Sequence, residues 1–154
     1  PLVEVARVEA VDGHGRPLEQ IETGDPVSLR VWLRRGDGSD IEPGVAVGVV
    51  RSDGLVCHCG STDLDGATPR RTDSGEFYIS LNFQKLPLFG GSYHFNVAAI
   101  DNRHPLILLD VKEGEAPFSV TNPKTDWGVC RLPHVWSHDG SGAAALDEGE
   151  GDRA

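Results

Sequence analysis

Basic residues are scarce in this sequence, and their scarcity limits the partners that the protein can have. The chain has 14 Lys and Arg against 24 Asp and Glu, which gives a formal net charge of -10. Phosphate backbones and anionic lipids repel such a surface, so neither nucleic acid nor a bare membrane surface is an expected partner. Residues 137–154 hold five acids and one base, so this terminal stretch carries a local net charge of -4.

Methionine is absent, and so is any long apolar run. No run approaches the ~18 residues that a membrane-spanning helix needs, and the N-terminus lacks the pattern of a signal peptide. The three cysteines (Cys57, Cys59 and Cys130) do not make a disulfide framework, and they suit a reducing cytosol. A sequence that lacks Met and starts directly in a strand pattern is expected to be a domain cut from a longer cytoplasmic protein.

A helical period of 3.6 residues is also missing, so no long helix is predicted. Short runs rich in β-branched and aromatic residues alternate instead with Gly, Pro and Asp, which is the rhythm of an all-β sandwich or barrel. Residues 61–75 are predicted to be a loop or an irregular edge. The predicted strands are 2–11, a short run ending at Ile21, 27–34, 45–49, 55–60, 76–84, 92–100, 106–111 and 116–121.

Period-two alternation divides the clearest strands into an inner and an outer face. In 27–34 the valines and leucines point one way, whereas Arg30 and Trp32 point the other. In 76–84 the outward residues are Tyr78, Ser80 and Asn82. In 92–100 His94, Asn96 and Ala98 point away from the aromatic side chains. Polar and aromatic outer positions on these strands are available for binding.

The C-terminal part of the chain changes character twice. After a short linker, residues 128–136 are predicted to form a last strand, in which Cys130, Leu132, His134 and Trp136 share a face. We interpret Leu132 and Trp136 as packing residues that anchor this strand, and Trp127 as interface or core. Beyond it, residues 137–154 consist of Gly, Ala, Ser and acids and are predicted to be a disordered tail, which leaves 1–136 as the folded domain.

The order of several segments resembles the C-terminal carbohydrate-binding domain of the ATP-binding subunit of O-antigen ABC transporters, the Wzt family. The segments are Thr23-Gly24-Asp25-Pro26-Val27-Ser28-Leu29, Asp53-Gly54-Leu55-Val56 with Ser61-Thr62, Leu86-Pro87-Leu88-Phe89-Gly90-Gly91-Ser92-Tyr93-His94-Phe95, Phe118-Ser119-Val120 and Gly128-Val129-Cys130-Arg131-Leu132-Pro133-His134-Val135-Trp136. Together they extend over nearly all of residues 2–136.

This resemblance implies an immunoglobulin-like or jelly-roll β-sandwich that recognises a bacterial polysaccharide, often at its non-reducing end, before export. It also implies a homodimer that exchanges the last strand, and an ATPase domain and a membrane subunit as partners at the inner face of the membrane. The nucleotide-binding pattern GxxxxGK[ST] is absent from this sequence, so no ATP hydrolysis is expected of it. No cofactor is expected.

Sugars bind to aromatic faces and to planar polar side chains, and both kinds lie outward on the predicted strands. Trp32 and Tyr78, with Arg30, Ser80 and Asn82 around them, form the first candidate surface. Cover by a loop or a dimer partner is the alternative for Trp32. His94 and Asn96 form a second candidate patch, for which ordinary solvated surface is the alternative. Arg30 or Arg34 could pair with an anionic group.

Two other classes of function stay open. The first is a structural domain that dimerises the transporter subunit and binds no sugar. The second is a metal-dependent enzyme built on Cys57-His58-Cys59. On a regular strand Cys57 and Cys59 share a face and His58 points away, which disfavours a metal site and favours small buried side chains. The carboxylates at strand ends, Asp101, Asp110 and Glu76, have no apolar setting that suits a general acid.

Overall fold

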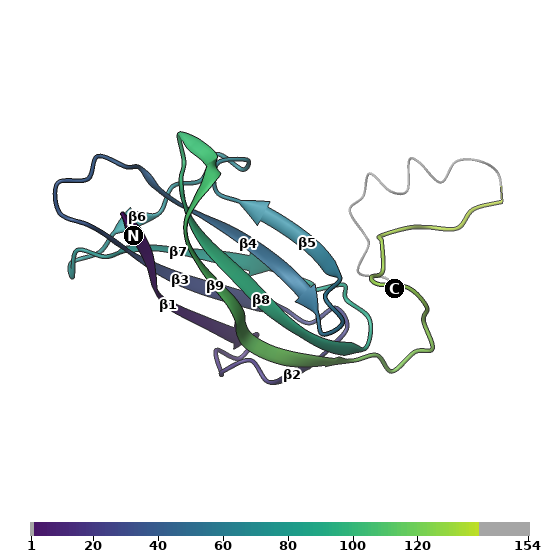
Figure 1. Ribbon diagram of the computed structural model, residues 1–154. Helices are drawn as coiled ribbons and strands as arrows, with labels where there is room; N and C mark the ends of the chain where they lie inside the picture. Colours follow the sequence, from purple (N-terminus) through teal and green to yellow (C-terminus); the bar gives the residue numbers. More distant parts are fainter. Residues whose placement is uncertain (1, 139–154) are drawn as a thin grey trace.

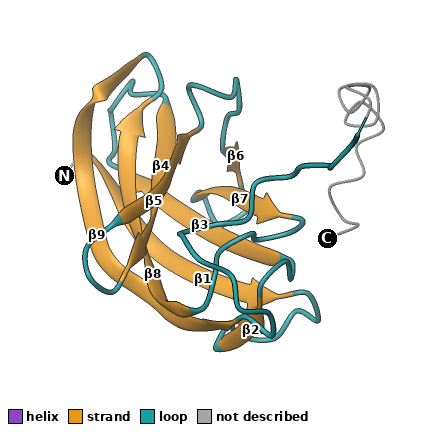
Figure 2. Ribbon diagram, turned by 90° about the vertical axis from the view of Figure 1, so that its right-hand side faces the viewer, coloured by secondary structure: helices purple, strands orange, loops and turns teal. Residues whose placement is uncertain are grey.

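The computed structural model describes residues 2–138, which form two β-sheets packed face to face (Figures 1 and 2). These residues include no helix, which confirms the predicted all-β class. The first sheet has the strand order β1-β3-β7-β6 and the second has the order β2-β9-β8-β4-β5. The strands are β1 (Val3–Asp12), β2 (Gln20–Glu22), β3 (Val27–Arg35), β4 (Pro43–Arg51), β5 (Val56–Ser61), β6 (Arg70–Arg71), β7 (Phe77–Phe83), β8 (Gly91–Asp101) and β9 (His104–Thr121).

Strand β3 shows how the alternating sequence builds the first sheet. Its four inward side chains, Val27, Leu29, Val31 and Leu33, are at most 1% exposed. Strand β7 runs antiparallel beside it with Leu29 opposite Leu81, so the apolar faces of both strands point into the sandwich. The predicted strands 27–34 and 76–84 therefore do share a sheet, and their polar residues share its outer face.

Strand β8 supplies the aromatic part of the core from the second sheet. Phe95 is fully buried, and its ring lies 5.4 Å from the ring of Phe118 on β9. The ring of Tyr93 also stacks on Phe118, at 5.7 Å, and the Tyr93 hydroxyl donates a hydrogen bond of 2.7 Å to the carbonyl of Phe89. Burying each of these rings stabilises the fold by roughly 1.5–3 kcal/mol, and the hydrogen bond satisfies the hydroxyl that Tyr93 buries.

Strand β9 differs from the prediction of two separate runs, 106–111 and 116–121. It is one strand of 18 residues that pairs with β8 through four register shifts. Ala116 has a positive φ of 48°, a conformation that non-glycine residues rarely adopt. Shifts of this kind bend a strand and let it continue along a twisted sheet. The C-terminal end of β9 pairs in parallel with β2, so the second sheet contains one parallel pair of strands among antiparallel ones.

Asn102 fixes the loop that follows β5. Its side chain accepts a hydrogen bond of 2.7 Å from the hydroxyl of Thr62 and donates one of 3.0 Å to the carbonyl of Ala67. Gly44 lies directly beneath it, and a Cβ at that position would be 2.0 Å from the Asn102 Oδ1 atom. The close approach requires glycine, and it holds residues 62–67 of the predicted loop against the sandwich.

Within a single chain, segment 128–136 does not form the predicted strand. Only Cys130 forms a bridge, to Leu88, and the rest of the segment makes no ladder with a strand in residues 2–138. Backbone hydrogen bonds from Phe89 to Val129 (3.0 Å) and from Arg131 to Pro87 (2.8 Å) attach its first part to the end of the sandwich. The expected tail at 137–154 lies almost wholly outside the described residues. Within them, no helix has the length and apolarity needed to cross a membrane.

Candidate functional site

An aromatic pair lies on the outer face of the four-stranded sheet. Trp32 on β3 stands opposite Tyr78 on β7, with ring centroids 5.0 Å apart and planes tilted by 48°. Arg7 on β1 stands opposite Trp32 on the other side, and its guanidinium carbon lies 3.8 Å from the centre of the indole ring. This cation–π contact covers one face of the Trp32 ring and leaves the residue half-buried within the chain.

Polar side chains continue this surface along β3 and β7. Arg30 stands opposite Ser80, and Ser28 stands opposite Asn82. The Ser80 hydroxyl donates a hydrogen bond of 2.9 Å to the Asn82 side-chain oxygen, which orients both groups. The structure thus brings together five residues that the sequence placed in the first candidate surface: Arg30, Trp32, Tyr78, Ser80 and Asn82. We call this surface, with Arg7, the aromatic face.

Two arginines near the aromatic pair were not predicted. Strict alternation from Val5 would place Arg7 on the inner face, but a register shift between Val5 and Arg7 turns it outward. Arg70 lies in the predicted loop 61–75, where a two-residue strand, β6, sets it opposite Tyr78. A bulge and a two-residue strand leave no hydrophobic period in a sequence, so no signal there could have found either residue.

The three strand-end carboxylates that could serve in acid–base catalysis each make a contact within the sandwich. Asp110 accepts a hydrogen bond of 2.8 Å from the backbone amide of Val5 and so ties the second sheet to the first. Glu76 pairs with Arg34 at 3.2 Å, and Asp101 caps the amide of Arg103 at 3.0 Å. They lie in different parts of the sandwich and do not form a pair suited to acid–base catalysis.

His94 and Asn96 lie outward on β8, as predicted, but on the opposite sheet from the aromatic face. The Asn96 side-chain oxygen accepts a hydrogen bond of 3.1 Å from the backbone amide of Gly114, so this group holds a turn of β9. The same sheet face contains a hollow of about 370 Å³, which we call the outer hollow. Apart from Asn96 its walls are largely aliphatic or glycine: Ala46, Gly48, Val50, Val56, Leu108 and Val111.

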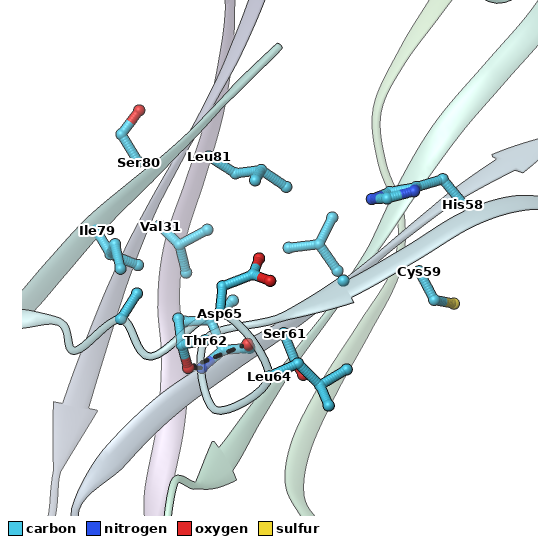
Figure 3. Close-up of a pocket in the computed structure, with 14 residues that line it drawn as sticks. Val31, His58, Cys59, Ser61, Thr62, Leu64, Asp65, Ile79, Ser80 and Leu81 are labelled. Carbon is cyan, nitrogen blue, oxygen red and sulfur yellow. Dashed lines mark hydrogen bonds between the residues drawn. The ribbon is translucent and has the colours of Figure 1, made fainter. Parts of the chain in front are cut away.

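A second hollow, the inter-sheet cleft, opens between the two sheets along β5 and β7 (Figure 3). It has a volume of about 210 Å³ and is lined chiefly by Val31, Val47, Ile79 and Leu81. Figure 3 shows the carboxylate of Asp65 pointing into it from the loop after β5. Of the aromatic face, Ser80 lines this cleft, whereas Trp32 and Tyr78 line neither hollow and form an open surface on the sheet.

The geometry expected for Cys57, His58 and Cys59 is wrong, because a bulge interrupts β5. Val49 stands opposite His58 and Val50 opposite Val56, which leaves Cys57 without a partner residue. Cys57 packs against the core, and the His58 ring lies 5.7 Å from the ring of Phe83 in the other sheet. Cys59 is exposed and so is not the small buried side chain that we expected.

Burial raises the pKa of the Cys57 thiol, which therefore stays protonated more readily than a free cysteine. Among residues 2–138, no group of three or more His, Cys, Asp or Glu side chains is arranged to hold a metal ion.

The terminal segment 128–136 does not bury the residues predicted to anchor it. Cys130 is half-buried and packs against the core, but Leu132 is 71% exposed and Trp136 is 88% exposed. His134 is exposed, and its ring contacts Trp136 at 6.0 Å between centroids. Trp127 is 90% exposed, so it is not a core residue. Among residues 2–138, three large apolar side chains of this segment, Leu132, Val135 and Trp136, are thus left exposed, as is Trp127 just before it.

The Wzt C-terminal domain model matches residues 2–132 of this sequence. The chain belongs to the Wzt C-terminal domain family. A crystal structure of the C-terminal domain of Wzt superposes with a TM-score of 0.68 at 14% identity, and the match covers 89% of this chain and 84% of that one. Membership of the Wzt family supports, in general terms, a role as the carbohydrate-binding module of an O-antigen ABC transporter.

Two structures of Bacteroides uniformis β-glucuronidases are more distant likenesses of this chain. One is a β-glucuronidase, and the other is a calcium-binding mutant of β-glucuronidase 2. Each has a TM-score of 0.52 at 11% identity, over 73% of this chain and 14% of that chain. At this identity the likeness concerns the sandwich fold alone. No curated protein matches the sequence.

Proposed function

We propose that this Wzt domain binds a bacterial surface polysaccharide, at its terminal residues, without altering it, and that it does so before the transporter exports the chain. The binding surface is the aromatic face. The observation that carries the proposal is the Trp32–Tyr78 pair, in which two rings 5.0 Å apart stand on the outside of a sheet. Adjacent large aromatic side chains on an outer sheet face are a feature of binding surfaces.

The chemistry of this face suits a sugar. A pyranose has one face of C–H groups, which an aromatic ring can cover, and a rim of hydroxyls, which need planar polar partners. Tyr78 and Trp32 supply the rings, and Ser80, Asn82 and Arg30 supply donors and acceptors two or four residues along the strands. The backbone ladder of β3 and β7 holds all of these groups, so little conformational entropy is lost on binding.

The partners expected of the Wzt family complete the proposal. The domain would be attached to an ATPase domain and act at the inner face of the membrane, beside the membrane subunit of the transporter. It would work as a homodimer, because a second copy could cover the apolar side chains of segment 128–136 by exchanging that segment. Two weak sites on one dimer bind a repetitive polymer more tightly than either site alone.

The outer hollow and segment 128–136 also suit the second candidate function, a dimerisation domain without sugar binding. Both expose large apolar side chains, and neither has the Trp32–Tyr78 pair with hydrogen-bonding groups on neighbouring strands. Affinity electrophoresis separates the two functions. The full chain is run through gels that contain the O polysaccharide of the source bacterium, with an unrelated dextran as control. Retardation by the first polymer alone supports sugar binding, and equal mobility in both gels supports the structural role.

A further inference from the structure

We propose that the aromatic face is built for an anionic glycan, whose carboxylate or phosphate group lies against Arg30 and Arg70 while a sugar ring covers Tyr78 and Trp32. The inference rests on the proposed function, since it names the class of polysaccharide that the same surface would take. It arises from the way in which charges are paired on that surface.

One row of residues crosses the first sheet with cations at both ends. Arg7 on β1 stands opposite Trp32 on β3, Trp32 stands opposite Tyr78 on β7, and Tyr78 stands opposite Arg70 on β6. Residues directly opposite each other in antiparallel strands share a face, so all four lie on the outside. An aromatic platform is therefore flanked by two guanidinium groups.

The neighbouring rows show which of these charges are already neutralised. Arg34 pairs with both Glu4 and Glu76, and the Arg7 Nε atom lies 3.8 Å from a carboxylate oxygen of Glu9. All three glutamates on this face therefore already have an arginine partner. Arg34 and Arg7 are therefore poor candidates to bind a ligand anion.

Arg30 and Arg70 are the two arginines of this face that are left to bind a ligand anion. Among residues 2–138, neither side chain makes an ion pair or a side-chain hydrogen bond. Arg30 has Glu9 opposite it on β1, but the ion pair of Glu9 is with Arg7. Arg30 is half-buried and stands opposite Ser80, and Arg70 is exposed, so both guanidinium groups are available to an oxyanion at this surface.

The position of these cations contrasts with the charge of the whole protein. The chain carries a net charge of -10, so its field repels a polyanion at long range. The outer face of the first sheet carries four arginines against three glutamates. Guanidinium groups recognise carboxylate and phosphate oxygens in a bidentate geometry, and both anions occur on sugars. Carboxylates and phosphates both offer a negatively charged oxygen, and the neutral hydroxyls of a sugar would not form the same ion pair with an arginine.

The test compares one polysaccharide before and after its charges are removed. The O polysaccharide of the source bacterium is used native, after carbodiimide–borohydride reduction of its carboxylates to alcohols, and after hydrogen fluoride cleavage of its phosphate esters. Each form is titrated calorimetrically into the full chain and into the variants Arg30→Gln and Arg70→Gln. Arg16→Gln, in the exposed turn before β2, is the matched control.

We expect one chemical treatment to weaken binding ~10-fold or more. Loss after reduction identifies a carboxylate, and loss after hydrogen fluoride identifies a phosphate. Arg30→Gln and Arg70→Gln should weaken binding of the native form but have little further effect on the treated form, and Arg16→Gln should match the unmutated protein. Equal binding of all three forms, or native affinity in both variants, overturns the anionic ligand and leaves the proposed function intact. Absence of binding to the native form overturns the proposed function itself.

Discussion

Trp32 and Tyr78 lie directly opposite each other on neighbouring strands, with their rings 5.0 Å apart on the outer face of the first sheet. The inner faces of the same strands hold Val31 and Ile79, so one register places both the core pair and the aromatic pair. A change at either ring can therefore be made on the outside of the sheet without opening the core.

Replacement of Trp32 or Tyr78 by Ala should weaken binding of the cognate polysaccharide by ~10-fold or more, because a sugar loses the surface on which it stacks. Trp32→Phe keeps a ring and should retain a larger part of the affinity. Calorimetric titration of the three variants measures this. Urea unfolding is the control, and we expect Trp32→Ala to remain folded with a loss of about 1 kcal/mol from its contacts with Arg7 and Tyr78. Undiminished binding in both Ala variants would place the site elsewhere.

Removal of residues 128–154 should convert a dimer to a monomer or prevent folding, because the exposed apolar side chains of 128–136 need a partner to cover them. Light scattering after gel filtration measures the mass. Removal of 139–154 alone is the matched control and should leave the mass per particle that of a dimer. If the deletion variant does not fold, the double variant Leu132→Asp, Trp136→Asp tests the same segment. A dimer of unchanged stability in this double variant would refute the exchange of the segment between protomers.

The hairpin between β4 and β5 contains an ion pair with a measurable titration. The Arg51 guanidinium donates two hydrogen bonds, of 2.9 and 2.8 Å, to the Asp53 carboxylate and lowers the pKa of Asp53 to about 2. Since the pKa is lower in the folded state, the stabilisation is complete above the ordinary value of 3.8 and is lost as the pH falls through about 2.

NMR detection of the Asp53 carboxyl carbon checks this pair. Its midpoint should rise toward 3.8 in Arg51→Gln and stay near 2 in the control Arg16→Gln. The same midpoint in Arg51→Gln and the unmutated protein would show that another group lowers the pKa.

The bulge at Cys57 predicts different reactivities for the three thiols. Cys59 is exposed, whereas burial raises the pKa of Cys57 and lowers its fraction of thiolate, the reactive form. Iodoacetamide should therefore modify Cys59 first, and mass spectrometry of peptides at timed intervals would measure the order. Cys59→Ser should remove the fast phase. Equal rates at Cys57 and Cys59 would be incompatible with the bulge.

Much of the fold could be predicted from strands in which every second residue is apolar. Strands β3, β7 and β8 follow this rule, and their inner faces coincide with the predicted ones because burial of one face dictates the side-chain direction. The outward direction of Trp32 and Tyr78 follows from the same rule. Their common sheet followed from analogy with other sandwiches, and only the register β3–β7 makes them neighbours.

The parts that could not be predicted are those in which the period breaks. One bulge turns Arg7 outward, and a second places Cys57 and Cys59 on different faces, whereas strict alternation puts Arg7 inside and the two cysteines on one face. Arg70 belongs to a strand too short to have a period. Segment 128–136 has the composition of a strand, but a strand needs a partner, and only Cys130 finds one in the described residues. The local sequence pattern indicates that a segment can pair as a strand, but it does not show whether a partner strand is available.

The most direct test of the central claim is an NMR titration of the full chain with oligosaccharides released from the non-reducing end of the O polysaccharide. The three tryptophans (Trp32, Trp127 and Trp136) give three indole N–H signals, assigned with single Trp→Phe variants. Binding at the aromatic face predicts that the Trp32 signal moves while the Asn96 side-chain amide on the opposite sheet stays in place. Movement of Asn96 with a stationary Trp32 would contradict the account and assign sugar binding to the outer hollow.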